Sequence, residues 1–164
     1  GNGATDLDLW GKYYWNLGND RTEVTAGAIL TVPTGDDSVG LGFDAFALKG
    51  FGALRWRLNA VILTGTIGLQ FNEDGRTLNS PPLEGETAFS AAAGVIAPWS
   101  DSFAFVGELT WEGNRFKGLD DASQLLGGLN LRLSDRSLLR PSLAIGLQDG
   151  APDWQIQVGY TYTF

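Results

Sequence analysis

The C-terminal stretch Trp154-Gln-Ile-Gln-Val-Gly-Tyr-Thr-Tyr-Thr-Phe164 alternates large apolar side chains with small or polar ones. Successive side chains of a β-strand point to opposite faces of a sheet, so this stretch would present one aromatic, apolar face and one polar face. A helix would need apolar residues at a spacing of 3.6 residues, and the stretch lacks that spacing. We therefore predict a β-strand that meets a different environment on each side.

The same alternation recurs along the chain. It is clearest in residues 6–16, 23–32, 103–112, 125–133 and 139–148. Residues 42–50 and 55–71 are also predicted to be strands, although the pattern does not decide how they face. The Ala-rich residues 87–97 are predicted to be a strand rather than a helix because they contain Gly94 and lie between other strands. The result is a single domain, residues 1–164, with about nine strands of roughly 9–14 residues.

The predicted connections alternate in length. Short turns are expected at residues 51–53, 98–101 and 134–136, and long loops at 34–41, 72–86 and 113–121, with a smaller one at 150–152. Short turns at one end and long loops at the other are typical of bacterial outer-membrane barrels, whereas a soluble sandwich has no reason to separate its loops by length. The predicted fold is an all-β, antiparallel, up-and-down transmembrane β-barrel.

The apolar set is bulky, and this decides which way it faces. A small soluble barrel would have to fit these large side chains into its narrow interior, whereas a membrane barrel turns them towards lipid. Aromatic residues near the predicted strand ends fit the interfacial girdles of membrane barrels. They are Trp15, Trp99, Trp111, Trp154, Tyr162 and Phe164. A soluble lipocalin-like ligand-binding barrel, with the apolar set inside, is the less favoured alternative.

Composition excludes several function classes. The 19 acidic residues outnumber the 11 basic ones, giving a formal net charge of -8, which disfavours nucleic acid as a partner. The chain has no Cys and no His, so thiolate metal sites, a Cys nucleophile and a Ser-His-Asp triad are all excluded. We expect no catalytic residue, no metal site and no cofactor, and hence no enzyme.

Paired carboxylates are the remaining candidates for chemistry. Asp6 with Asp8, and Glu108 with Glu112, each share a predicted strand face, but neither pair has a third partner, and we interpret them as solvated charges. The loop pairs Asp36–Asp37, Glu73–Asp74 and Asp120–Asp121 lack the ligand spacing of a Ca²⁺ loop. They are interpreted as solvated loop acids.

The polar face of the predicted strands is interpreted as the lining of a lumen. The predicted pore-lining residues are Asp6, Asp8, Lys12, Tyr14, Glu23, Thr25, Glu108, Thr110, Glu112, Asn130, Arg132, Arg140, Gln155, Gln157 and Thr161. Two interpretations stay open. The charges line a wet channel whose acid excess favours cations or neutral solutes, or they pair across a narrow interior and plug it.

Two resemblances extend this interpretation. The terminal Tyr160, Tyr162 and Phe164 resemble the C-terminal assembly signal by which the barrel-insertion machinery recognises bacterial outer-membrane proteins. Four other stretches resemble a family of outer-membrane transporters named for its link to the meta-pathway of phenol degradation. These stretches are Asp6-Leu-Asp-Leu-Trp-Gly-Lys-Tyr13, Leu30-Thr-Val-Pro-Thr-Gly-Asp36, Gly107-Glu-Leu-Thr110 and Leu147-Gln-Asp-Gly-Ala-Pro-Asp-Trp154.

The family resemblance implies a barrel of about a dozen strands in the bacterial outer membrane, an even number as in other single-chain bacterial barrels. It also implies passage of small solutes, apolar or aromatic ones among them, with outer-membrane lipid and the insertion machinery as partners. An odd count of nine strands then suggests that this chain is the C-terminal portion of a longer barrel. The expected function is passive transport of small solutes. The alternative is a non-conducting barrel that acts as a membrane anchor or as a surface-interaction protein, chiefly through residues 72–86.

Overall fold

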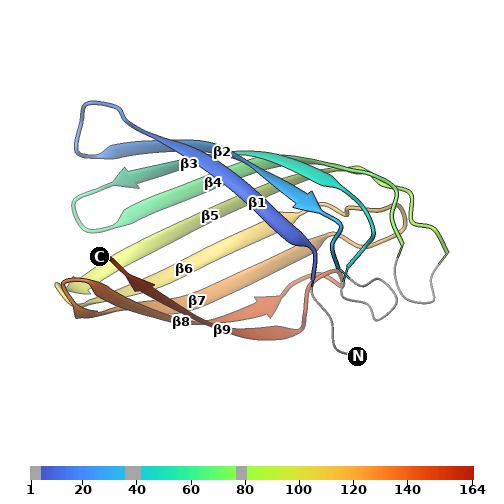
Figure 1. Ribbon diagram of the computed structural model, residues 1–164. Coiled ribbons are helices and arrows are strands. Elements are labelled where there is room, and N and C mark those ends of the chain that lie inside the picture. Colours follow the sequence, from blue (N-terminus) through green and yellow to red (C-terminus); the bar gives the residue numbers. More distant parts are fainter. Residues whose placement is uncertain (1–4, 36–41, 77–80) are drawn as a thin grey trace.

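The described strands form one antiparallel sheet. The computed structural model describes residues 5–35, 42–76 and 81–164. Within these ranges the strands are β1 (Leu7–Asn16), β2 (Thr22–Val32), β3 (Ala47–Arg57), β4 (Ile62–Asn72), β5 (Thr87–Ser100), β6 (Phe103–Glu112), β7 (Ala122–Ser134), β8 (Ser137–Gly146) and β9 (Trp154–Tyr162). Each strand pairs antiparallel with its neighbours in sequence, in the order β1 to β9 (Figure 1). The all-β, up-and-down prediction is confirmed.

The predicted boundaries are wrong in one region. Residues 51–53, predicted as a turn, lie inside β3. The predicted strands 42–50 and 55–71 therefore have the wrong bounds, because the structure has β3 at Ala47–Arg57 and β4 at Ile62–Asn72. The turn lies at residues 58–61, where the Leu58 N–H donates to the Val61 carbonyl oxygen at 2.8 Å. Gly50 and Gly52, on either side of Phe51, are strand residues with open space where a Cβ would stand. The predicted turn at 98–101 is also displaced, because Pro98 is still in β5, next to a register shift.

The connections do sort by length. Short turns lie at 17–21, 58–61, 101–102 and 135–136, at the end where β9 finishes (Figure 1). The described parts of the longer connections 33–46 and 73–86, and the whole of 113–121 and 147–153, lie at the other end, where β1 begins. Residues 36–41, with the predicted acid pair Asp36–Asp37, and residues 77–80 lie outside the described residues. The separation of turns from loops is confirmed for the part of the chain described.

The described parts of the three longest loops pack together. Phe116 is only 2 % exposed, and its ring centroid lies 5.3 Å from that of Phe43. Backbone hydrogen bonds tie the loops to one another: the Lys117 N–H donates to the Glu84 carbonyl oxygen, and the Glu86 N–H donates to the Arg115 carbonyl oxygen, both at 2.9 Å. We call these segments, residues 42–46, 73–76, 81–86 and 113–121, the loop cluster.

The strand register defines two faces. Residues opposite each other in neighbouring strands share a face, so the face of Glu23 continues through Arg55, Thr64 and Gly94 to Glu108. We call this the polar face and the other the apolar face. Every charged residue within the described strands lies on the polar face. These residues are Asp8, Lys12, Glu23, Lys49, Arg55, Arg57, Glu108, Glu112, Arg132 and Arg140.

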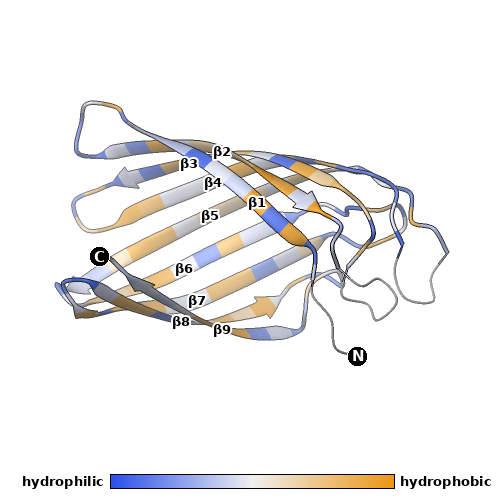
Figure 2. Ribbon diagram, in the orientation of Figure 1, coloured by the Kyte–Doolittle hydropathy of each residue, from blue (hydrophilic) through white to orange (hydrophobic). Residues whose placement is uncertain are grey.

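The polar face is the shielded one. On it, Gln70 and Ala88 are each 3 % exposed and Ala144 is 1 % exposed. On the apolar face, Ile67 is 61 % exposed and Ile156 is 66 % exposed. A sheet shields one face in this way when it curves towards that face, and the ribbon is strongly curved (Figure 1). The hydropathy colours alternate along the strands, as the two faces require (Figure 2).

The described sheet is not closed. Its edge strands, β1 and β9, make no contact with each other within the described chain. Every residue of both strands is exposed.

Candidate functional site: the polar face

The register places the predicted lumen residues together, with one exception. All of the predicted residues from Asp8 onwards lie in strands and on the polar face. Asp6 precedes β1, and its carboxylate accepts hydrogen bonds from the backbone N–H groups of Gly35 at 2.9 Å and Phe43 at 3.3 Å. Asp6 therefore anchors the connection between β2 and β3, and it does not pair with Asp8, whose carboxylate accepts the Thr31 hydroxyl at 2.6 Å.

One ion cluster lies on the polar face near the short turns. The Glu23 carboxylate in β2 pairs with the guanidinium groups of Arg55, at 3.7 Å, and Arg57, both in β3. The Glu23 side chain is 15 % exposed, so the pairing is partly shielded from water. Arg57 also donates to the Asp20 carbonyl oxygen at 3.3 Å and so links the cluster to the first turn.

A second cluster lies towards the loops and spans several strands. The Glu112 carboxylate lies 3.7 Å from the Lys49 ammonium and 3.5 Å from the Arg115 guanidinium. Lys49 is in β3 and Glu112 in β6, three strand spacings or about 14 Å apart along a flat sheet. The Lys49 stem passes over Gly68, where an added Cβ would come within 3.1 Å of the Lys49 Cε. Curvature of the polar face and the absence of a side chain at Gly68 together allow this contact.

Lys49, Arg55 and Arg57 are functional candidates that the sequence analysis missed. The pattern does not decide the facing of the predicted strands 42–50 and 55–71, which a turn at 51–53 would separate. A usable signal was present: Lys49, Arg55 and Arg57 share one parity, and the apolar Leu48, Leu54 and Trp56 share the other.

The polar face contains a hollow of about 440 Å³ beside the second cluster. Charged and hydroxyl groups share its lining with an aromatic ring and small apolar residues. The lining includes Lys49, Phe51, Ser90, Thr110, Glu112 and Gln124. A lining that combines apolar surface with a few charged and hydroxyl groups is typical of sites for small molecules.

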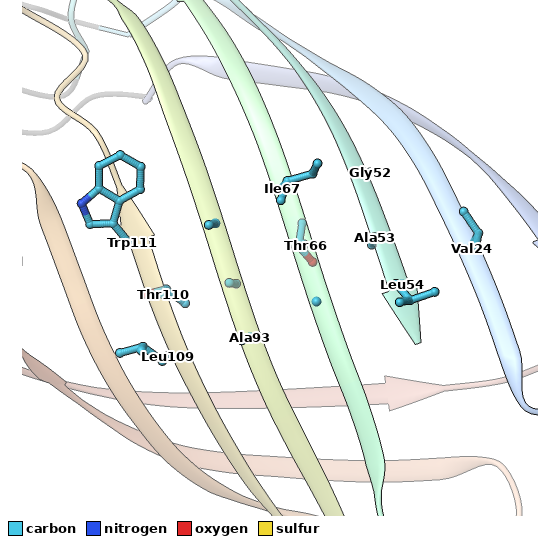
Figure 3. Close-up of a pocket in the computed structure, with 13 residues that line it drawn as sticks. Val24, Gly52, Ala53, Leu54, Thr66, Ile67, Ala93, Leu109, Thr110 and Trp111 are labelled. Atoms are coloured by element: carbon cyan, nitrogen blue, oxygen red, sulfur yellow. The ribbon is translucent and has the colours of Figure 1, made fainter. Parts of the chain in front are cut away.

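The apolar face carries a different hollow, of about 580 Å³, across β2 to β6 (Figure 3). Its floor contains the small residues Gly52, Gly65 and Ala93, and larger side chains such as Ile67 and Trp111 stand around it. Nothing in this lining supplies a charge. It is a shallow apolar depression in the exposed surface.

The described residues contain no group of three or more acidic side chains placed to hold a metal ion. The loop acids have structural roles instead. The Asp74 carboxylate accepts the Gly85 N–H at 2.8 Å, and the Asp121 carboxylate accepts the Asn114 N–H at 3.0 Å. In the loop cluster, the hydrogen bond from the Lys117 ammonium to the Glu84 carboxylate raises the pKa of Lys117.

The predicted assembly signal lies at the end of the edge strand. Tyr160 and Tyr162 lie on the apolar face of β9, and Phe164 follows it. The Phe164 ring stacks edge-on against Tyr162, with centroids 5.2 Å apart, and Phe164 is fully exposed.

The described part of the chain has no helix long and apolar enough to cross a membrane. No protein-family model matches the sequence, and a search of curated proteins finds no significant match. The resemblance to the transporter family therefore stays a hypothesis.

Proposed function

We propose that this sheet is part of an outer-membrane β-barrel that lets small solutes diffuse passively across the bacterial outer membrane. The observation that carries the proposal is the inverted polarity of the sheet. Large apolar side chains are exposed on the apolar face, and every charge in the described strands lies on the polar face, whose central residues are shielded. A protein in water would gain free energy from the reverse arrangement, whereas a sheet in lipid needs this one.

The strand lengths support a membrane setting. The eleven residues of β4 make a strand about 36 Å long. A tilt of about 40° reduces its height to about 28 Å, close to the apolar band of about 25 Å in membrane barrels.

Aromatic residues on the apolar face gather at both ends of the strands. Trp15, Trp56, Trp99 and Tyr162 lie towards the short turns. Phe71, Phe89, Trp111 and Trp154 lie towards the longer loops. Two such belts, one at each membrane–water interface, are a feature of membrane barrels, because aromatic rings prefer the headgroup region.

The polar face favours a wet channel over a plug. Glu23 pairs with Arg55 and Arg57 of the neighbouring strand and so stays against the wall, and a hollow of about 440 Å³ stays free beside the Lys49–Glu112 pair. Passive diffusion needs this kind of lining, which is polar, charged in both signs and not filled by side chains. The resemblance to the phenol-degradation transporter family adds apolar or aromatic compounds to the solutes proposed.

The loop cluster favours a second candidate, a barrel that serves as an anchor or a surface for interaction. Its core around Phe116 and its inter-loop hydrogen bonds give that end of the sheet a defined shape. In this alternative side chains would fill the space over the polar face and exclude water, and the loop cluster would form the interaction surface.

Cysteine labelling in lipid bilayers distinguishes these functions. The chain has no Cys, so single variants Thr66→Cys and Thr110→Cys report on the polar face, and Ile67→Cys and Leu109→Cys report on the apolar face. For a channel, a membrane-impermeant maleimide labels the first pair and spares the second. No labelling of either pair would favour the anchor. A folded monomer in detergent-free buffer would overturn the membrane proposal itself.

A further inference from the structure

The hollow of about 440 Å³ on the polar face has a floor of short side chains between walls of longer ones. Its floor lies on β4 and β5 and includes Thr66, Ser90 and Ala92. Strand β3 supplies one wall, and β6 and β7 supply the other. The space over the floor is therefore free for a small molecule, and its volume lies within the range of about 300–1,000 Å³ that is usual for ligand sites.

The wall on the side of β2 and β3 is apolar. The Phe51 ring lies over Gly27, because a Cβ added to Gly27 would come within 2.6 Å of the Phe51 Cζ atom. Ile29 lies two residues from Gly27 on the same face and also lines the hollow. An apolar group that enters the hollow can leave water by packing against these two side chains.

Positive charge is in excess beside this apolar wall. Two cations share one carboxylate, because Glu112 Oε1 lies 3.7 Å from the Lys49 ammonium and 3.5 Å from the Arg115 guanidinium. This buried oxygen has no hydrogen-bond partner in the described part of the chain, and both distances are long for hydrogen bonds. Lys49 lines the hollow with a side chain that is 22 % exposed, so its ammonium can donate to a solute.

The polar face as a whole carries the same sign of charge. Six of the ten charged residues in the described strands are basic and four are acidic, a net charge of +2, whereas the whole chain has -8. The acid excess that the sequence suggests for the lining is absent from the described strands, because Lys49, Arg55 and Arg57 add three positive charges to the polar face.

We propose that this hollow binds a small organic monoanion, a carboxylate on a compact apolar body. Lys49 donates to the carboxylate and the body packs against Phe51 and Ile29, so that the bound anion balances the excess positive charge of the cluster. An inorganic anion would not use the apolar wall, and an organic cation would meet charge of its own sign. This inference rests on the proposed function, because an interior filled by side chains would admit no solute.

Methyl NMR on the whole chain, refolded in dodecylmaltoside micelles, tests the site. The δ1 methyl group of Ile29 reports on the hollow, and that of Ile67, on the apolar face, reports on partition of a solute into detergent. Three probes share one ring and differ in charge: cyclohexanecarboxylate, cyclohexylmethanol and cyclohexylmethylammonium. Acetate is the fourth probe and carries the charge without the ring.

Cyclohexanecarboxylate should shift the Ile29 signal in a saturable way, whereas the Ile67 signal should not saturate. Its affinity should exceed that of each other probe by about tenfold or more, because hydrogen bonds to charged groups and burial of an apolar ring both strengthen binding. Equal or tighter binding of the alcohol or the ammonium compound would overturn recognition of the negative charge. Equal binding of acetate would overturn the part of the proposal that assigns an apolar body.

Substitution of Lys49 tests the residue that carries the recognition. Lys49→Gln should weaken binding of cyclohexanecarboxylate by about tenfold or more, and Lys49→Arg, which keeps the charge, should retain it. Arg21→Gln is the matched control, because it removes one positive charge at the short turn 17–21, outside the lining of the hollow. Unchanged affinity in Lys49→Gln, or an equal loss in Arg21→Gln, would overturn the assignment.

Maleimide labelling of Thr66→Cys in lipid bilayers separates this inference from the proposed function. If Thr66→Cys is labelled and no probe shifts Ile29 in a saturable way, the polar face is wet and the solute site is refuted. If Thr66→Cys is not labelled and Ile29 does not respond, the channel and the solute site are refuted together.

Discussion

Replacing Ile67 by arginine tests the lipid-facing assignment at the centre of a strand. Ile67 is the middle residue of β4 and is 61 % exposed on the apolar face. If that face meets lipid, the guanidinium enters hydrocarbon near the midplane, which costs about 2–4 kcal/mol in membrane barrels. Since about 1.4 kcal/mol corresponds to a tenfold change, the folding equilibrium constant should fall by a factor of about 30 to 700.

The adjacent Thr66→Arg is the matched control. Thr66 lies on the polar face and lines the hollow of about 440 Å³, so an arginine there has room and access to water. We expect this variant to lose less than about 1 kcal/mol. The same contrast applies to Leu129→Arg and Asn130→Arg on β7, which lie on the apolar and polar faces.

The assay is reversible urea unfolding from phosphatidylcholine bilayers, followed by tryptophan fluorescence. In water, an arginine at the exposed position of Ile67 would change stability by only about 0.5 kcal/mol in either direction. Equal free energies of unfolding for Ile67→Arg and Thr66→Arg would refute the reasoning.

Three further predictions follow from local packing and charge. Gly27→Ala should destabilise the sheet by about 1–3 kcal/mol, because the added Cβ would lie 2.5 Å from the backbone oxygen of Gly11 in β1. Gly52→Ala, whose Cβ would have no atom within 4 Å, should leave the free energy of unfolding unchanged in the same urea assay. Phe116→Ala should remove about 3 kcal/mol from the stability of the loop cluster, so proteolysis should cut those loops first, and an unchanged cleavage pattern would contradict this. Because the hydrogen bond from Lys117 to Glu84 raises the pKa of Lys117, this pair should stabilise the loops at neutral pH and lose its effect in alkali as Lys117 deprotonates. In Glu84→Gln an NMR titration of the Lys117 ammonium should move to lower pH, and an unmoved titration would show that the pair is not formed.

Much of the fold could be predicted from alternation alone. The last strand and residues 103–112 were placed correctly because their two faces differ sharply, and the register then carries that assignment across the sheet. The prediction failed around residues 51–53. There Gly50 and Gly52 look like turn residues, whereas the actual turn at 58–61 contains no Gly or Pro.

The ion clusters could be predicted only in part. The alternation within their own strands predicts that Glu23, Glu108 and Glu112 share the polar face. It does not predict the ion-pair partners of Glu23 and Glu112. The contact between Lys49 and Glu112 crosses three strand spacings and depends on the curvature of the sheet, which period-two patterns do not encode. The role of Asp6 as a loop anchor also depends on tertiary contacts. Its hydrogen-bond partners Gly35 and Phe43 lie 29 and 37 residues further along the sequence.

Spin-label accessibility along β4 tests the central claim most directly. The claim is that the apolar face meets lipid and the polar face meets water. Single cysteines at positions 63 to 71 of the cysteine-free chain would carry a nitroxide in bilayers, and collisions with oxygen and with a water-soluble nickel complex would be compared. The account predicts a two-residue period in which Leu63, Gly65, Ile67, Leu69 and Phe71 favour oxygen and the residues between them favour nickel. The opposite phase, or no alternation, would contradict it.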